Sequence, residues 1–509
     1  VLLALDAVDL LEAEEAPVDL ERSLPTHLAV YRDLNANYYS DPARRPERAA
    51  PSPQPPMRRW QPRDGGPLRV AIVGAGPSGS YAAEELLTQA GLHARVDMFE
   101  RLPVPGGLVR YGVAPDHGNT KLIESDFRHT MKRVGFRLIA NTEVGRNITH
   151  DQLASRYHAI IYAVGATADR PLGIPGESLG GSHSATEFVA WYNGHPDHAG
   201  RQFDLGRERA VVVGNGNVAL DVARVLLADP ASLRRTDIAD HALECLSRSR
   251  VNEVVIIGRR GPAEAAFTTP ELLGLKHLDG IDVIVPASDL PASGSSQTPG
   301  HAALDKLGVL LQLSRQRPRA GKRIVLRFQH SPVEILGQNR VEGIRLARND
   351  LVHQDGKVIA RPSAERLDLA CGLVLRSVGY RGQPIDGLPF DETRGTLPQS
   401  GGRVMSPDSG QPVRGVYAVG WIKRGPSGVI GTNKTCARET VSALLTDYEA
   451  GLLPTPIVET DILKLAPEST DLAGWSAIDS SERQSGLRSA RPRVKIVDRA
   501  KMLEVARRG

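Results

Sequence analysis

The sequence predicts an α/β protein built from two Rossmann-like dinucleotide-binding domains, with the second domain inserted into a discontinuous first one. Three observations support this fold class. A strand, a glycine-rich turn and a helix are expected near residues 68–87, and the same order recurs at residues 209–227. A third strand, loop and helix follow at residues 415–446, with a composition suited to completing the site of the first unit.

Length and composition are those of a globular protein. The 509 residues allow about three domains, and 41% hydrophobic with 24% charged residues is ordinary. The net charge of +4 is too small to indicate a nucleic-acid partner. No apolar run reaches the roughly 18 residues that a membrane span needs, and the N-terminus lacks the pattern of a signal peptide.

Cysteine usage narrows the chemistry further. The three cysteines form no C-x-x-C pair and lie far apart, at Cys245, Cys371 and Cys436. The sequence therefore offers no redox disulfide motif, no iron–sulfur ligand set and no zinc site, and we expect no bound metal. Free cysteines also favour a reducing compartment, which predicts a cytoplasmic protein.

Residues 1–67 are expected to form an acidic N-terminal helix and a proline-rich linker. Two interpretations of residues 1–40 stay open, a peripheral helix docked on the body and a segment that binds an additional partner or ends a missing upstream domain. Residues 41–67 contain eight prolines, which predicts an extended, semi-rigid linker. Because the chain starts at Val1 and not at Met, it either begins inside a longer product or uses a non-standard start codon.

The first dinucleotide unit runs from Leu68 to Glu100. Its apolar strand is followed by the G-x-G-x-x-G motif, and an acid follows about 20 residues later; the motif glycines are Gly74, Gly76 and Gly79. These glycines allow the chain to turn, the backbone to approach a pyrophosphate and the helix to pack closely. The helix N-terminus offers free N–H groups to phosphates, and Glu100 can accept hydrogen bonds from ribose hydroxyls.

The second unit carries the G-x-G-x-x-A form of the motif at Gly214, Gly216 and Ala219. Its following strand ends in a glycine and two arginines, Arg259 and Arg260, where the first unit has Glu100. A carboxylate repels a 2′-phosphate, whereas arginine is suited to bidentate phosphate binding. We therefore expect the first unit to bind FAD and the second to bind NADP(H) and not NAD(H).

The third segment has the features of a flavin site. A strand at 415–420 leads through a glycine-rich loop into a helix, whose N-terminus can stabilise negative charge on a reduced flavin. We therefore expect residues 68–168 and 377–509 to form the two parts of the FAD-binding domain, and residues 169–376 to form the NADP-binding domain. A basic cluster near residues 315–323 has two open interpretations, a docking surface for an acidic partner and a charged hairpin face.

Six motifs together resemble one family, and the similarity runs from about Leu68 to the end of the chain. They are VAIVGAGPSG, GLVRYGVAPDH, VVVGNGNVALDVAR, VVIIGRRGPAEAAFTTPEL, LVLRSVGYRG and YAVGWIKRGPSGVIGTNK. The chain resembles the adrenodoxin reductase group of NADPH–ferredoxin reductases, most closely the actinobacterial ferredoxin–NADP reductases. It departs from some members at Pro105-Gly106-Gly107, where they carry Trp, and at Gly118, where many carry Pro.

The resemblance implies a set of site residues. FAD contacts are implied at Ser78, Gly79, Glu100, Leu108, Val144, Trp421, Gly428, Val429 and Ile430. NADP contacts are implied at Arg170, Asn215, Gly216, Asn217, Val218, Arg259, Arg260, Glu271 and Gly428. Glu271 would lie near the nicotinamide carboxamide. His117 and Asp221 match a polar pair near the flavin and nicotinamide, for which proton handling and a structural role both stay open.

The activity implied is that of an FAD-dependent NADPH:ferredoxin oxidoreductase, which passes a hydride from NADPH to FAD and then single electrons to an acidic, ferredoxin-type iron–sulfur protein. One alternative is a flavin subunit similar to the small subunit of glutamate synthase, feeding electrons to a tightly bound partner. The lack of cysteine clusters argues against it. A second alternative is a non-enzymatic flavin-binding scaffold. The missing C-x-x-C excludes a thioredoxin-reductase-like enzyme.

Overall fold

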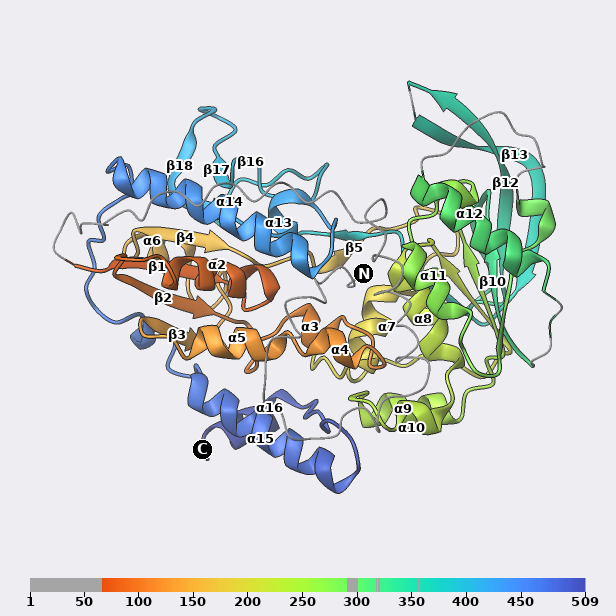
Figure 1. Ribbon diagram of the computed structural model, residues 1–509, viewed down its shortest axis with the longest axis horizontal. Coiled ribbons are helices and arrows are strands. Elements are labelled where there is room, and N and C mark those ends of the chain that lie inside the picture. The colour runs from red at the N-terminus through yellow and green to blue at the C-terminus, as the bar shows by residue number, and fades with distance from the viewer. Residues whose placement is uncertain (1–65, 291–300, 317, 319–320, 356, 509) are drawn as a thin grey trace.

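The computed structural model describes residues 66–290, 301–316, 318, 321–355 and 357–508 (Figure 1). The expected N-terminal helix, the partner segment at 1–40 and nearly all of the linker lie outside the described residues. Among the residues that are described, no helix is both long and apolar enough to cross a membrane.

The first domain is organised around a seven-stranded sheet with the order β16-β17-β18-β4-β1-β2-β3. Its strands are β1 (Leu68–Val73), β2 (Ala94–Phe99), β3 (Phe136–Ile139), β4 (Ala159–Tyr162), β16 (Gln399–Ser400), β17 (Arg403–Met405) and β18 (Pro412–Ala418). The strands from β18 to β3 are parallel, and β16 and β17 add an antiparallel edge.

Successive side chains of β1 point to opposite faces of this sheet and are buried on both. Val70 and Ile72 pack into one apolar cluster, while Ala71 and Val73 pack into another on the opposite face. A parallel strand that is buried on both sides needs such a continuous apolar run. The helices of this domain are α2 (Pro77–Leu87), α3 (Leu108–Tyr111), α4 (Gly118–Lys121), α5 (Glu124–Met131), α6 (His150–Ala154), α13 (Trp421–Arg424) and α14 (Ile430–Glu449).

The second domain contains a six-stranded parallel sheet with the order β6-β14-β7-β8-β10-β9. Its strands are β6 (Ser182–Ser184), β7 (Arg209–Val213), β8 (Glu253–Ile257), β9 (Ile281–Ile284), β10 (Lys322–Arg327) and β14 (Leu373–Arg376). Its helices are α7 (Ala185–Tyr192), α8 (Asn217–Leu227), α9 (Pro230–Leu233), α10 (Asp240–Ser247), α11 (Thr269–Leu275) and α12 (His301–Ser314).

An antiparallel sheet covers the face of the second sheet that is opposite α8. It consists of β11 (His330–Leu336), β12 (Gly343–Gln354) and β13 (Lys357–Ala370), and its far end projects from the domain in Figure 1. Ile335, Ile344 and Leu346 of this sheet share a buried cluster with Val211 and Val255 of the parallel sheet. The loop that joins β10 to β11 lies near the end of β8, because Gln329 and His330 donate backbone hydrogen bonds to the residues that follow β8.

The predicted fold class is confirmed, because the strands of the second sheet all fall between the two stretches that build the first. Where the chain leaves and re-enters the first domain, β5 (Ala168–Asp169) and β15 (Tyr380–Arg381) pair as an antiparallel ribbon. The two crossings are thus hydrogen-bonded to each other. At the other end of the interface, Lys495 lies between α15 (Leu472–Arg488) and α16 (Arg499–Ala506) and contacts Arg110 and Asp237 of the two domains.

Candidate functional site

Two adjoining cavities lie where the domains meet. The first cavity has a volume of about 490 Å³ and is lined mainly by the first domain, and the second has a volume of about 800 Å³ and is lined mainly by the second domain. Both cavities share a wall made of Val218, Tyr380, Trp421, Gly428 and Val429. Ligands bound in the two cavities would therefore meet at this wall.

The first cradle, defined here as Gly74, Gly76, Gly79 and Glu100, has the geometry that its glycines predict. Gly74 has a φ of +109°, and a Cβ there would lie 2.6 Å from the carbonyl oxygen of Ala163. A Cβ on Gly79 would lie 2.0 Å from the carbonyl oxygen of Gly74, so α2 packs against the turn only with glycine there. Gly79 acts through this packing, while Gly74, Gly76 and Glu100 line the first cavity.

Glu100 closes the first cradle. Its carboxylate accepts hydrogen bonds from the backbone N–H of Ala75 at 3.1 Å and of Leu102 at 3.0 Å. Burial raises the pKa of Glu100, and these two backbone bonds oppose the rise. One acceptor site on each oxygen is used by the protein, which leaves the other lone pairs for hydroxyl donors such as those of a ribose.

A loop covers the first cradle. Gly106 donates its N–H to the carbonyl oxygen of Ala75 at 2.9 Å. Gly107 has a φ of +50°, and a Cβ there would lie 2.9 Å from the Cα of Gly76. The two backbones therefore touch at the turn, and the Pro105-Gly106-Gly107 sequence permits this contact because neither glycine carries a side chain.

The remaining residues expected at the flavin line the first cavity: Ser78, Leu108, Val144, Trp421, Gly428, Val429 and Ile430. Ser78 donates its hydroxyl to Oδ1 of Asn433 at 3.0 Å, which ties α2 to the first turn of α14. Trp421 donates its indole N–H to the carbonyl oxygen of Ser427 and lies 5.2 Å from the ring of Tyr380. Val429, the residue directly before α14, is part of the shared wall, so the positive end of this helix lies there.

The second cradle, defined here as Gly214, Gly216, Arg259 and Arg260, repeats this design in the inserted domain. Gly214 has a φ of +114°, and a Cβ there would lie 2.2 Å from the carbonyl oxygen of Ser377. A Cβ on Gly216 would meet no heavy atom of the described residues within 4 Å. The start of α8 is therefore open to the cavity, and its free N–H groups are suited to a pyrophosphate.

The arginine pair lies at the rim of the second cavity. This cavity is lined by the expected NADP residues other than Glu271: Arg170, Gly214, Asn215, Gly216, Asn217, Val218, Arg259, Arg260 and Gly428. Asn217 also holds the loop after the arginines, because its Oδ1 accepts the N–H of Thr268 at 2.8 Å. The arginines thus sit on a loop that is tied to the helix of the same cradle.

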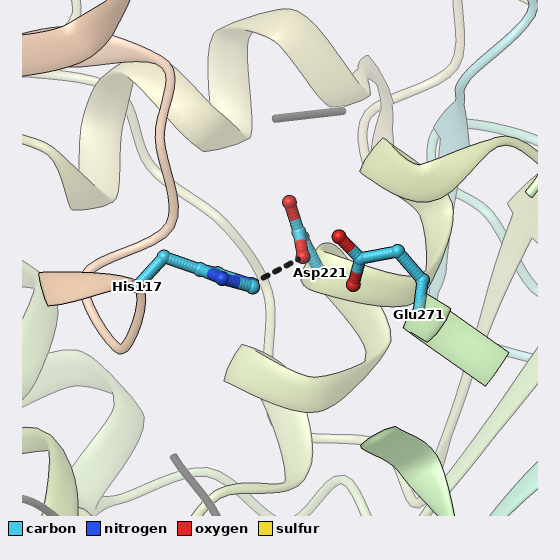
Figure 2. A group of neighbouring side chains, drawn as sticks. All are labelled: His117, Asp221 and Glu271. Atoms are coloured by element: carbon cyan, nitrogen blue, oxygen red, sulfur yellow. Dashed lines mark hydrogen bonds and ion pairs between the residues drawn. The ribbon is translucent and has the colours of Figure 1, made fainter. Parts of the chain in front are cut away.

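Glu271 lies with His117 and Asp221 (Figure 2) and is not among the residues that line the second cavity. One nitrogen or oxygen atom from each of the three side chains lies within 4.8 Å of the others, and all three residues are buried. His117 comes from the first domain, whereas Asp221 on α8 and Glu271 on α11 belong to the second. Asp221 also lines the first cavity.

Arg224 completes this cluster, although the sequence analysis did not single it out. Its guanidinium donates to Asp221 at 2.8 Å and to Asp116 at 3.0 Å. Burial alone would raise the pKa of Asp221, but the charges of Arg224 and His117 outweigh it and hold the pKa below its ordinary value. His, Asp and Glu are also metal-ligand types, yet the guanidinium of Arg224 already lies against Oδ1 of Asp221 and Nε2 of His117.

The Nε2 atom of His117 has two competing partners. It lies 3.2 Å from Oδ1 of Asp221 and 2.5 Å from Nη2 of Arg224. The ring donates to Asp221 only when Nε2 carries a proton, and it accepts from Arg224 only when Nε2 carries none. Burial and Arg224 would lower the pKa of His117, but Asp221 and Asp116 outweigh them and raise it.

Two further residues at the site were missed or read differently from sequence. Tyr380 lines both cavities, but a tyrosine after a strand carries no distinctive signal. From the sequence, the charge of Lys423 could meet either a phosphate or an acidic partner, whereas in the structure its ammonium pairs with Glu439 at 2.7 Å. Of the basic cluster, Lys322 donates to the carbonyl oxygen of Leu227 and Arg323 pairs with Glu253, so both already have partners in the second domain.

Two adjoining dinucleotide cradles, one closed by a carboxylate and the other by an arginine pair, define the class of pyridine nucleotide-dependent flavoprotein oxidoreductases. The family model described as pyridine nucleotide-disulphide oxidoreductase matches residues 68–261. The probable ferredoxin/ferredoxin–NADP reductase of Mycobacterium leprae is 45% identical over 490 residues, covering 93% of this chain and 84% of that protein.

Shorter relatives match almost over their full length. The NADPH-ferredoxin reductase FprA of Mycobacterium tuberculosis is 47% identical over 457 residues, which covers 86% of this chain and 99% of the relative. The solved structure of Mycobacterium tuberculosis FprA in complex with NADPH has a TM-score of 0.82 at 46% identity, covering 87% of this chain and 100% of that chain. The chain belongs to the adrenodoxin reductase-type family of NADPH–ferredoxin reductases.

Proposed function

We propose that this protein is an FAD-dependent NADPH:ferredoxin oxidoreductase, which takes a hydride from NADPH and delivers single electrons to a ferredoxin-type iron–sulfur protein. The observation that carries the proposal is the pair of adjoining cavities, with Glu100 at one nucleotide corner and Arg259 with Arg260 at the other. The names of the relatives, which include NADPH-ferredoxin reductase FprA, support the same activity.

The first cradle fits FAD. Glu100 would accept the ribose hydroxyls, Gly76 and the start of α2 would hold the pyrophosphate, and Val144 and Leu108 would line the cavity beside them. Bound FAD would supply the chemistry that links a two-electron donor to a one-electron acceptor. The start of α14, at Gly428, Val429 and Ile430, would stabilise negative charge at the shared wall.

The second cradle fits NADP(H). The open α8 start at Gly216 would hold the pyrophosphate, and Arg259 with Arg260 would bind the 2′-phosphate by charge-assisted hydrogen bonds. Arg170 and Asn215 would complete the lining. The shared wall of Trp421 and Tyr380 would exclude water where the two ligands meet.

His117 and Asp221 are proposed as the proton-handling pair. Asp221 orients the ring of His117, and Arg224 holds both side chains across the domain interface. A proton at Nε2 of His117 would be donated to Asp221 in a hydrogen bond, and once that proton has passed to water the same Nε2 would accept from Arg224. Glu271 lies beside this pair and would contact the nicotinamide end of the second ligand.

The boundaries proposed for the two domains are 68–168 with 377–509 for FAD and 169–376 for NADP. They agree with the ribbon of β5 and β15 at the crossings. An acidic iron–sulfur protein is the proposed partner. A second partner at residues 1–40 and a cytoplasmic location stay predictions.

The decisive experiment is ferredoxin-dependent reduction of cytochrome c by NADPH. The purified protein should be yellow and release FAD on denaturation, and turnover should depend on added ferredoxin. Attraction to an acidic partner should weaken steeply as salt rises. A colourless preparation that cannot be reconstituted with flavin would contradict the proposal. Co-purification with a second enzyme subunit at high salt would instead favour the flavin-subunit alternative, which the comparisons do not favour.

A further inference from the structure

A buried asparagine lies directly beneath the arginine pair of the second cradle. The pairing of β12 with β13 shifts its register between Ala347 and Asn349, so Asn349 follows an irregularity in the strand. The residue is only 2% exposed. Its Nδ2 donates to the carbonyl oxygen of Arg259 at 2.7 Å and to Oγ of Ser331 at 2.8 Å. Both amide hydrogens are therefore used on groups that belong to the second cavity.

The backbone around the arginines is fixed at three successive carbonyls. His330 donates its N–H to Gly258 at 3.1 Å, and Gln329 donates its N–H to Arg260 at 2.9 Å. Between these two bonds lies the bond from Asn349 to Arg259, which alone among the three comes from a side chain. Asn349 also donates its own N–H to Gln329 at 2.7 Å, so it joins the loop before β11 to the arginine turn.

The cost of burying this amide argues that its two donated bonds matter. Among the described residues, no donor reaches Oδ1 of Asn349, although that atom is fully buried. A buried acceptor without a partner carries a desolvation penalty, which an apolar side chain at this position would avoid. A role in packing alone therefore does not account for an asparagine here.

Ser331 extends the argument to the cavity wall. Its hydroxyl oxygen accepts from Asn349, and Ser331 lines the second cavity together with Arg259 and Arg260. Because the oxygen already accepts a hydrogen bond from Asn349, the hydroxyl hydrogen points elsewhere and is available to an acceptor such as a phosphate oxygen. One buried amide thus sets the backbone of Arg259 and the hydroxyl of Ser331.

We propose that Asn349 is a positioning residue for recognition of the 2′-phosphate of NADP(H), acting through Arg259 and Ser331. The inference rests on the proposed function of the second cradle. Arg259 is exposed, so the orientation of its side chain toward the 2′-phosphate depends on how firmly its backbone is held. Loss of the hydrogen bond from Asn349 would make this backbone less well positioned before the ligand binds. The open helix start at Gly216, which would hold the pyrophosphate, makes no use of Asn349.

The test compares two probes that differ by the 2′-phosphate. Dissociation constants of 2′,5′-ADP and of 5′-AMP, which lacks only the 2′-phosphate, are measured by calorimetry on the FAD-loaded enzyme with Asn349→Leu, using Asn339→Leu as control. Asn339 is exposed on the loop between β11 and β12, so the control makes the same chemical change outside the cradle. We expect Asn349→Leu to weaken binding of 2′,5′-ADP about tenfold, while binding of 5′-AMP and both affinities of the control variant change less than about twofold.

A double-mutant cycle tests whether Asn349 acts through Arg259. In an Arg259→Ala background, Asn349→Leu should cost clearly less than its tenfold effect in the native chain, because one of its two targets has lost the group it positions. Equal weakening of 2′,5′-ADP and 5′-AMP binding, or full additivity in the cycle, would overturn the proposal. Unchanged binding of 2′,5′-ADP in Asn349→Leu would overturn it as well.

A second variant covers the case in which the leucine chain does not fold. Asn349→Ser keeps a polar group but is too short to reach the Arg259 carbonyl, and it should weaken 2′,5′-ADP selectively. If it binds 2′,5′-ADP as tightly as the native chain, the proposal fails. If Arg259→Ala alone leaves 2′,5′-ADP binding unchanged, the assignment of the second cradle fails instead, so the two failures are distinguishable.

Discussion

In the first cradle β2 is followed by Glu100, whereas in the second β8 is followed by Gly258, Arg259 and Arg260. The rest of the design is shared: a buried parallel strand, a glycine with positive φ that touches a neighbouring carbonyl, and a helix whose start faces the cavity. The fold therefore provides a generic pyrophosphate site twice. We propose that a few side chains at one corner determine which dinucleotide each site accepts.

The cradles also differ in how they are covered. Gly107 presses against Gly76, so the first helix start lies beneath a loop. Near Gly216 a methyl group would meet no heavy atom of the described chain within 4 Å. A covered cradle suits a cofactor that stays bound, and an open one suits a nucleotide that must enter and leave on every turnover.

The largest expected effect comes from removing the guanidinium pair. Arg259→Ala with Arg260→Ala should raise KM for NADPH at least about a hundredfold, since two charge-assisted contacts are lost. KM for NADH should change less than about threefold, because NADH lacks the 2′-phosphate. Steady-state ferricyanide reduction measures both constants, and a parallel rise for NADH would refute the assignment of this corner.

Glycine-to-alanine exchanges in the two cradles should separate packing from ligand access. Gly79→Ala places a Cβ 2.0 Å from the carbonyl oxygen of Gly74, and overpacking of this kind typically costs about 1–3 kcal/mol of unfolding free energy. Gly216→Ala meets no protein atom of the described residues, so it should unfold like the native chain but bind NADP+, which contains the pyrophosphate, more weakly. Urea denaturation with ligand titration checks both, and a stable Gly79→Ala protein would count against the packing argument.

Replacing the carboxylate of the first cradle should loosen the flavin alone. Glu100→Gln keeps the size of the side chain but removes its charge, and one oxygen acceptor becomes an N–H donor that faces a backbone N–H. We expect the dissociation constant for FAD to rise about tenfold, with 2′,5′-ADP binding unchanged. Flavin absorbance after dilution and gel filtration reports retention. Native-like retention would show that Glu100 does not contribute to FAD binding.

The smallest effect is a pH dependence at the cluster between the cradles. The folded-state pKa of His117 is raised above 6.5, so its contribution to stability is fully present below pH 6.5 and is lost as pH rises through the folded value. The native chain should therefore lose stability relative to His117→Gln as pH rises above 6.5. Parallel urea titrations at several pH values measure this difference, and identical pH profiles for the two chains would contradict the account.

Local motifs allowed much of the site to be predicted. Both glycine turns, Glu100 and the arginine pair belong to short segments whose geometry depends on neighbouring residues. Glu100, the arginine pair and the first two glycines of each turn line the two cavities, and Gly79 packs behind its turn. The inserted topology also followed from the composition of the segment at 415–446. Such features can be predicted from the sequence because the spacing of their residues along the chain determines their geometry.

Contacts between distant segments could not be predicted. Arg224 joins Asp116 to Asp221 across the domain interface, and Asn349 supports Arg259 from 90 positions away. The apolar pattern of residues 369–378 predicts one further strand, but the structure divides this segment, with β13 ending at Ala370 and β14 beginning at Leu373 in a different sheet. Gly372 lies at this break, where a Cβ would meet the side chain of Arg207, a contact that depends on the tertiary structure.

The most direct test of the central claim is the ratio of kcat/KM for NADPH to that for NADH, measured on the native chain in ferricyanide reduction. A corner built from Arg259 and Arg260 predicts a ratio of at least about one hundred in favour of NADPH. A ratio near one would contradict the claim that this corner determines which nucleotide the enzyme uses.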